Sequence, residues 1–124
     1  MFPSTLLRYL ALSALFVAPI STAMADDASD TRAAYQAALK CFVANGNAEA
    51  ERLRAGDKPG AARYDTAAKQ SFDGAVKLGR MLGLTNRQLN HDLDVIQASE
   101  LPRMVKDRSY FIDAVATCKG LGLM

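Results

Sequence analysis

The sequence predicts an all-α fold, a compact bundle of four to five helices closed by one disulfide. Three observations lead to this prediction. After residue 25, apolar side chains recur three and four positions apart, as on one face of a helix, and no stretch alternates polar and apolar residues like a strand. Residues typical of helix ends separate these stretches. The chain also has two cysteines, the number that one disulfide needs.

The first 25 residues have the features of a secretory signal peptide. One cation, Arg8, precedes an apolar run over residues 9–18, and Ala23 and Ala25 are the small residues that a signal peptidase recognises. The run is too short to span a bilayer, which takes about 20 residues. We therefore expect this segment to be removed, leaving residues 26–124 as a single helical domain that is periplasmic or secreted.

The composition of this domain restricts the classes of partner. It has 99 residues, near the usual size for one core, and carries 14 Lys and Arg against 13 Asp and Glu. Nucleic acids and anionic membranes call for a concentrated basic patch, whereas these charges are interspersed. We expect neither as an obligatory partner. No second apolar run is long enough to cross a membrane, so no span is expected once the leader is removed.

The two cysteines, Cys41 and Cys118, both lie in the predicted exported domain. In an oxidising compartment they most simply form one intramolecular disulfide. Free buried thiols, metal ligation and an intermolecular bond are the alternatives. The predicted bond closes a loop of 77 residues. Loop entropy then gives it about 4.5 kcal/mol of the free energy of unfolding, which is a structural role.

The first predicted helix covers residues 31–45, with Asp30 as its N-cap and Gly46 as its C-terminal stop. A short second helix is predicted over residues 48–55. The glycine-containing residues 56–60 then form the clearest loop. The predicted apolar face of the first helix consists of Tyr35, Ala38, Leu39 and Phe42.

The longest predicted helix covers residues 61–82 and stops at Gly83. It contains Gly74 and Gly79, each of which costs about 1 kcal/mol relative to alanine in a helix. We expect that a neighbouring helix approaches closely at these glycines, which would account for the cost. The predicted apolar stripe consists of Tyr64, Ala68, Phe72, Ala75, Val76, Gly79 and Leu82.

The start of the next helix is the best marked in the chain, because Thr85 and Gln88 have the spacing of a capping box. Pro102 cannot lie inside a helix without losing a hydrogen bond. We therefore expect this helix to end or kink near Glu100, with a brief turn around Met104. Its predicted apolar face consists of Leu89, Leu93 and Ile96.

The last predicted helix covers residues 108–119, with Asp107 as its N-cap and Gly120 as its stop. Its predicted buried face consists of Phe111, Ala114, Val115 and Cys118. The apolar tail that follows is expected to dock on the bundle. It consists of Leu121, Leu123 and Met124.

The sequence contains no catalytic or metal-binding pattern. The one histidine, His91, lies two positions from Leu89 and Leu93 and so points away from their face, and zinc sites need three or four protein ligands. A haem held by His91 and Met81 or Met104 would require the histidine to face the core. Motifs for serine hydrolysis, phosphate loops, thiol redox and haem attachment are absent. We expect no enzyme activity, no metal and no cofactor.

The remaining interpretation is a non-enzymatic interaction protein that presents a helix face or groove to another protein or a small ligand. An inhibitor or immunity protein for an exported enzyme is one version of it. Aromatic residues and methionines are favoured at contact surfaces, although they are also common in cores. The candidate contact residues are Tyr64, Met81, Met104, Tyr110 and Phe111.

A second interpretation is a stress chaperone. Size, export, all-α character and a single disulfide are similar in outline to the small acid-activated periplasmic chaperones. That resemblance implies a fold that loosens at low pH and exposes apolar surface. The carboxylates that could contribute, if they are paired in the folded state, are Asp92, Asp94, Asp107 and Asp113.

Overall fold

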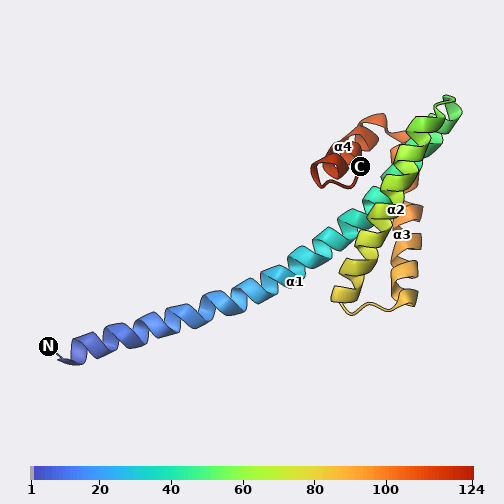
Figure 1. The fold of residues 1–124 in the computed structure, drawn as a ribbon. Coiled ribbons are helices and arrows are strands. Elements are labelled where there is room, and N and C mark those ends of the chain that lie inside the picture. Colours follow the sequence, from blue (N-terminus) through green and yellow to red (C-terminus); the bar gives the residue numbers. More distant parts are fainter. Residues whose placement is uncertain (1) are drawn as a thin grey trace.

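The structure is a computed structural model that describes the backbone of residues 2–124 and the side chains of residues 27–124. Within these residues the chain forms four helices, α1 (Phe2–Arg54), α2 (Lys58–Met81), α3 (Asn86–Lys106) and α4 (Arg108–Gly120). The predicted all-α bundle is confirmed (Figure 1). The predicted leader, residues 1–25, lies outside the side chains that are described and stays a prediction.

Helix α1 is the element on which the others assemble. Helices α2, α3 and α4 all pack against it, and α4 also packs against α3. Two short turns join α1 to α2 and α2 to α3, so α2 runs antiparallel to both neighbours and α3 runs parallel to α1 (Figure 1). Over the residues described, no helix combines the length and the apolar character of a membrane span.

Helix α1 begins at Phe2 and includes Asp30, so the predicted N-cap at Asp30 is wrong. The helix also continues through Gly46, so the prediction of two helices over residues 31–45 and 48–55 is wrong. Gly46 is exposed, and nothing lies within 4 Å of the position that its Cβ would take. Ala44 and Ala48, on either side, are both buried in the core. Their packing outweighs the cost of one helical glycine, about 1 kcal/mol.

Helix α3 also continues past its predicted end near Glu100, with Pro102 inside it, to Lys106. The predicted turn at Met104 is therefore wrong as well. The reason lies in the last turn, where Met104 is 2% exposed and belongs to the core cluster that contains Phe111. Burial of this side chain offsets the hydrogen bond that the proline cannot donate.

The predicted signals at three helix ends are confirmed. The Thr85 N–H donates to Gln88 Oε1 (2.8 Å) and the Gln88 N–H donates to Thr85 Oγ1 (3.2 Å), which is a complete capping box. Gly83 ends α2 with a φ of 76°, and Asp107 caps α4 by accepting from the Tyr110 N–H. These signals depend only on residues that are close together in the sequence, which is why the sequence predicts them correctly.

Two other helix boundaries differ from the prediction. Helix α2 begins at Lys58, not at residue 61, because the Asp57 side chain accepts a hydrogen bond from the Gly60 N–H and starts the helix one turn earlier. Helix α4 includes Gly120, and the residue with positive φ that follows it is Gly122 (φ 72°). Gly122, and not the predicted Gly120, is therefore the glycine that adopts the left-handed conformation after the helix.

The two glycines within α2 have different surroundings. A Cβ on Gly79 would collide with the Leu89 side chain and come within 3.2 Å of Tyr35 Cε1. The predicted close approach of neighbouring helices is confirmed there. Gly74 has nothing within 4 Å, so the same prediction is wrong for it. Gly79 allows α1, α2 and α3 to meet at one point.

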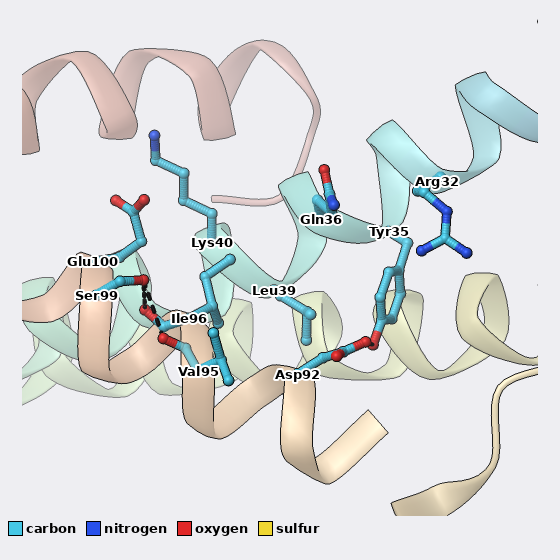
Figure 2. Close-up of a pocket in the computed structure, with 10 residues that line it drawn as sticks. All are labelled: Arg32, Tyr35, Gln36, Leu39, Lys40, Asp92, Val95, Ile96, Ser99 and Glu100. Carbon is cyan, nitrogen blue, oxygen red and sulfur yellow. Dashed lines mark hydrogen bonds between the residues drawn. The ribbon is translucent and has the colours of Figure 1, made fainter. Parts of the chain in front are cut away.

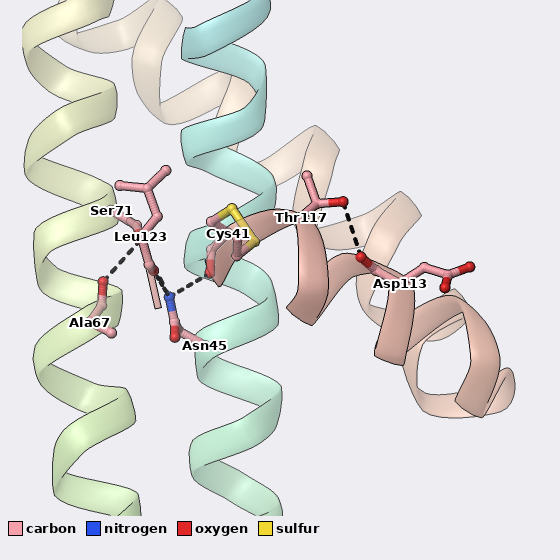
Figure 3. Close-up of a disulfide and its surroundings, with 8 residues drawn as sticks. Cys41, Asn45, Ala67, Ser71, Asp113, Thr117 and Leu123 are labelled. Carbon is pink, nitrogen blue, oxygen red and sulfur yellow. Dashed lines mark hydrogen bonds between the residues drawn. A yellow bond between two sulfur atoms is a disulfide. The ribbon is translucent and has the colours of Figure 1, made fainter. Parts of the chain in front are cut away.

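The disulfide between Cys41 and Cys118 joins the C-terminal half of α1 to the end of α4, with Cα atoms 5.6 Å apart (Figure 3). Both residues lie in one core cluster, which also contains Phe111 and Ala114 of the predicted α4 face. Leu123 and Met124 of the tail pack against this cluster, whereas Leu121 is exposed. A second cluster, near the turn between α2 and α3, contains Tyr35, Ala38, Leu39, Ala75 and Leu89.

Candidate functional site

The first of two clefts beside α3 is a groove between α1, α2 and α3, with a volume of about 420 Å³. We call it the apolar groove. Two of its side chains on α3 are well exposed, Leu101 at 40% and Val105 at 66%. The aliphatic and aromatic side chains that line it are Phe42, Val43, Ala50, Ala68, Leu101 and Val105.

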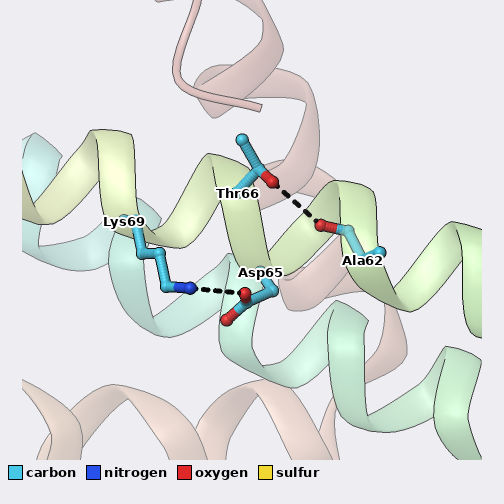
Figure 4. A network of polar contacts seen from close by, with 4 residues as sticks. All are labelled: Ala62, Asp65, Thr66 and Lys69. Atoms are coloured by element: carbon cyan, nitrogen blue, oxygen red, sulfur yellow. Dashed lines mark hydrogen bonds and ion pairs between the residues drawn. The ribbon is translucent and has the colours of Figure 1, made fainter.

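Polar side chains of both signs also line the apolar groove. Glu49 and Arg54 come from α1, Asp65 from α2 and Gln97 from α3. The Asp65 carboxylate is paired with Lys69 Nζ at 2.9 Å, one turn further along α2 (Figure 4). The groove therefore combines apolar lining with charged residues that can contact the polar face of a bound segment.

The groove lies away from the turn that joins α2 to α3. At that turn, Gly79 of α2 lies against Leu89 of α3 and the space between the helices is filled. Further along, Ala68 of α2 and Leu101 of α3 line opposite parts of the open groove. The Phe42 and Phe72 rings lie next to each other here, with centroids 5.7 Å apart.

The second cleft lies between α1 and α3 and also has a volume of about 420 Å³. We call it the charged cleft (Figure 2). Its α1 side has Arg32, Gln36 and Lys40, each one turn after the last. Its α3 side has Asp92 and Glu100. Apolar side chains lie between the charged groups, namely Leu39, Val95 and Ile96.

Each carboxylate of the charged cleft accepts a hydrogen bond from a tyrosine. The Tyr35 hydroxyl donates to Asp92 Oδ2 at 2.8 Å, and the Tyr110 hydroxyl donates to Glu100. Tyr35 is only 1% exposed, and its burial, followed by the hydrogen bond to Asp92, raises the pKa of the phenol well above its usual value. These bonds fix both carboxylates in place.

At the end of the charged cleft near α4, two cations contact the Tyr110 ring, namely Lys40, which lines the cleft, and Arg103, which does not. Lys40 Nζ lies 4.7 Å from the centroid of the Tyr110 ring, and Arg103 Cζ lies 4.0 Å from it. Such contacts stabilise a cation at a partly exposed site by about 0.5–1 kcal/mol. The aromatic ring therefore holds the Lys40 side chain at this end of the cleft.

The candidate contact residues of the sequence analysis lie elsewhere. None of the five lines the apolar groove or the charged cleft. Met104 and Phe111 are buried in the core, and Tyr64 and Tyr110 are half-buried. Met81 is 72% exposed at the end of α2. Their types were typical of contact residues, but helix packing decided which of them reached the surface.

The four carboxylates named for an acid response have separate surroundings. Asp92 is bound to Tyr35, and Asp94 and Asp113 are exposed. Asp107 caps α4, where hydrogen bonds from the Ser109 hydroxyl and then the Tyr110 N–H hold the pKa of its carboxyl below the usual value. These residues do not form one cluster. His91 is exposed on α3.

The burial of three polar residues, Asn45, Asn47 and Ser71, was not predicted from the sequence. Asn45 Nδ2 donates to the carbonyl oxygens of Cys41 (2.9 Å) and Leu123 (2.8 Å), and it lies 3.3 Å from Ser71 Oγ (Figure 3). In the sequence, Asn45 precedes a glycine and indicated a turn. Its position one helical turn after Cys41, on the buried face, was the available signal.

Between residues 27 and 124, no three His, Cys, Asp or Glu side chains are close enough together to hold a metal ion. Comparison with known proteins adds no relative, since no protein-family model, no curated protein and no solved structure matches this chain. The two clefts and the disulfide-closed bundle are therefore the observations from which a function is proposed.

Proposed function

We propose that this protein is a non-enzymatic binding protein that accepts an amphipathic helix of a partner protein in the apolar groove. The observation that supports the proposal is the exposed apolar lining of the groove, above all Leu101 and Val105. A partner helix lying there would contact α1, α2 and α3 at once. It would pack beside these three helices as an additional helix, and helical domains commonly bind peptides in this way.

The contact energy expected from the groove is moderate. Complete burial of a valine or leucine side chain contributes about 1.5–3 kcal/mol, and Leu101 and Val105 are already partly covered. Each is then expected to contribute about 1 kcal/mol to binding. The charged residues of the groove would add selectivity, because a partner must avoid placing like charges beside Asp65 and Arg54.

The test is capture of a partner from the exported proteins of the source cell. The oxidised protein should retain one stoichiometric partner at neutral pH, and the variant Leu101→Asp/Val105→Asp should reduce that retention at least tenfold. Met81→Asp is the matched control, because Met81 is also exposed and apolar but lies outside the groove. It should bind as the unmodified protein does.

Two results would contradict this proposal. Equal loss of the partner from the groove variant and from Met81→Asp would show that the groove is not the contact surface. Retention of many different proteins at low pH, with none at neutral pH, would instead favour an acid-activated chaperone. Circular dichroism of each variant should be recorded first, to confirm that the helices are intact.

A further inference from the structure

We propose that the charged cleft binds a short peptide with free termini and an apolar side chain. The cleft lies on the other flank of α3 from the apolar groove, and it shares no lining residue with it. A ligand there is therefore independent of the helix-binding function proposed above.

The positive and negative charges that line the cleft are equal in number, which disfavours a ligand that carries charge of only one sign. Arg32 and Lys40 on α1 contribute two positive charges, and Asp92 and Glu100 on α3 contribute two negative charges. Among the ion pairs of residues 27–124, none joins two of these four groups. Each end of the cleft thus offers one cation and one anion to a ligand, and a zwitterion satisfies both signs.

The spacing of the charges fits a peptide of about three residues. Arg32 and Lys40 are eight residues apart in α1, and Asp92 and Glu100 are eight residues apart in α3. Eight residues of helix rise about 12 Å. An extended chain advances about 3.3–3.6 Å per residue, so three to four residues separate an ammonium and a carboxylate by this distance.

The middle of the cleft suits the body of such a peptide. Leu39, Val95 and Ile96 provide apolar contacts for a side chain, and Val95 is exposed. Gln36 lies halfway between the two cations and has an amide that can both donate to and accept from a peptide group. A volume of about 420 Å³ is within the usual range for ligand sites.

The two ends of the cleft are already ordered without a ligand. Asp92 receives the Tyr35 hydroxyl on Oδ2, which leaves Oδ1 for a ligand ammonium. At the other end, the Tyr110 ring positions Lys40 and its hydroxyl binds Glu100. Charged groups that are fixed before binding lose less conformational entropy when the ligand arrives.

The experiment is a titration of the oxidised, ¹⁵N-labelled protein with the tripeptide Ala-Leu-Ala, followed by NMR. We expect saturable shifts confined to residues 32–40 and 92–100. Acetylation of the peptide's N-terminus or amidation of its C-terminus should each weaken binding at least tenfold. Absence of saturable shifts up to millimolar peptide, or equal affinity of the capped peptides, would overturn the proposal.

Substitutions in the protein locate the site. Arg32→Gln and Asp92→Asn should each weaken binding at least tenfold, whereas Arg80→Gln on α2 and Asp94→Asn on α3 should leave it unchanged. Asp94 is the matched control for Asp92, because both lie on α3 but Asp94 does not line the cleft. If the control variants lose as much affinity as the cleft variants, the proposed site is wrong.

Two further ligands test the chemical class. Free leucine reaches only one end of the cleft and should bind at least tenfold more weakly than the tripeptide. Octanoate has an apolar body and a carboxylate but no ammonium, and it should also bind more weakly. If leucine binds with the same affinity as the tripeptide, the ligand does not span the cleft. If octanoate binds with the same affinity, the site binds anionic amphiphiles. Either equality would overturn the proposal.

Discussion

At the scale of single residues, Asn45 shows how a polar side chain can order an apolar core. Its amide nitrogen binds carbonyl oxygens of α1 and of the C-terminal tail, at Cys41 and Leu123, and the Ser71 hydroxyl also lies within hydrogen-bond distance of the tail. The amide nitrogen has these partners, whereas the buried Oδ1 of Asn45 has none among residues 27–124, and an unpaired buried polar group costs about 1–3 kcal/mol. The tail therefore completes the core.

Tyr35 leads to a prediction for alkaline pH. Its pKa is raised above the usual value of 10.0 by burial and by the hydrogen bond to Asp92. A group with a raised pKa in the folded state contributes stability that is full below its unfolded pKa and is lost as pH rises toward the folded pKa. Above pH 10, we expect the free energy of unfolding to fall, and Tyr35 to ionise only when the protein unfolds.

The measurement is a pH titration of tyrosinate absorbance together with circular dichroism. One phenol should ionise in the same step in which helical signal is lost, and this step should lack a tyrosinate contribution in Tyr35→Phe. Tyr64→Phe is the control, because Tyr64 has no bond to a carboxylate among the residues described and is half-buried. Ionisation of every tyrosine near pH 10 with the helices intact would contradict the prediction.

At the scale of the elements, the two glycines of α2 allow a matched comparison. Gly74→Ala should raise the free energy of unfolding by about 0.5–1 kcal/mol, because alanine is the better helix former and space is available. Gly79→Ala should lower it by about 1–2 kcal/mol, because the added methyl group would displace Leu89 and crowd Tyr35. Urea unfolding of the three proteins measures both changes.

The packing is tested by the opposite signs of the two expected changes in the free energy of unfolding. If both variants were stabilised, the contact of α1, α2 and α3 at Gly79 would be looser than described. If both were destabilised, Gly74 would have a role that its open surroundings do not explain.

The sequence predicted those parts of the elements that depend on neighbouring residues. The capping box at Thr85, the αL glycine at Gly83 and the Asp107 cap are local, and all three were correct. Gly46 was predicted to end a helix, and Pro102 to end or kink one, because the helix propensities of these residues are poor. Contacts from distant parts of the chain keep both inside helices, and propensity does not include those contacts.

The clefts could not be predicted in the same way. Whether Leu101 is exposed beside Ala68 depends on the separation of α2 and α3, which no local pattern determines. Arg32 and Asp92 lie at the same cleft only because α3 runs parallel to α1 in one particular register, which no local pattern determines either. The disulfide could be predicted from the sequence, because two cysteines allow only one intramolecular pair.

At the scale of the whole molecule, the disulfide is expected to supply a large share of stability. Its loop of 77 residues corresponds to about 4.5 kcal/mol by loop entropy, while a domain of this size has on the order of 5–15 kcal/mol in all. Reduction should therefore lower the free energy of unfolding by up to about 4 kcal/mol. Urea unfolding with and without a reductant measures the difference.

The control is Cys41→Ala/Cys118→Ala, whose unfolding should not respond to the reductant. Both sulfur atoms are buried, so the wild-type protein should be reduced in the unfolded state before it is compared. An unchanged urea midpoint for the reduced wild-type protein would show that packing of α4 alone closes the fold.

The same bond has a consequence for the order in which the chain folds during synthesis. Cys118 follows Cys41 by 77 residues, so α2 and α3 are both made before the bond can close. The hairpin of α1 and α2 depends on contacts that are near in sequence, and such contacts form quickly. We therefore expect oxidation of these two thiols to come late, after α4 has docked on the other three helices.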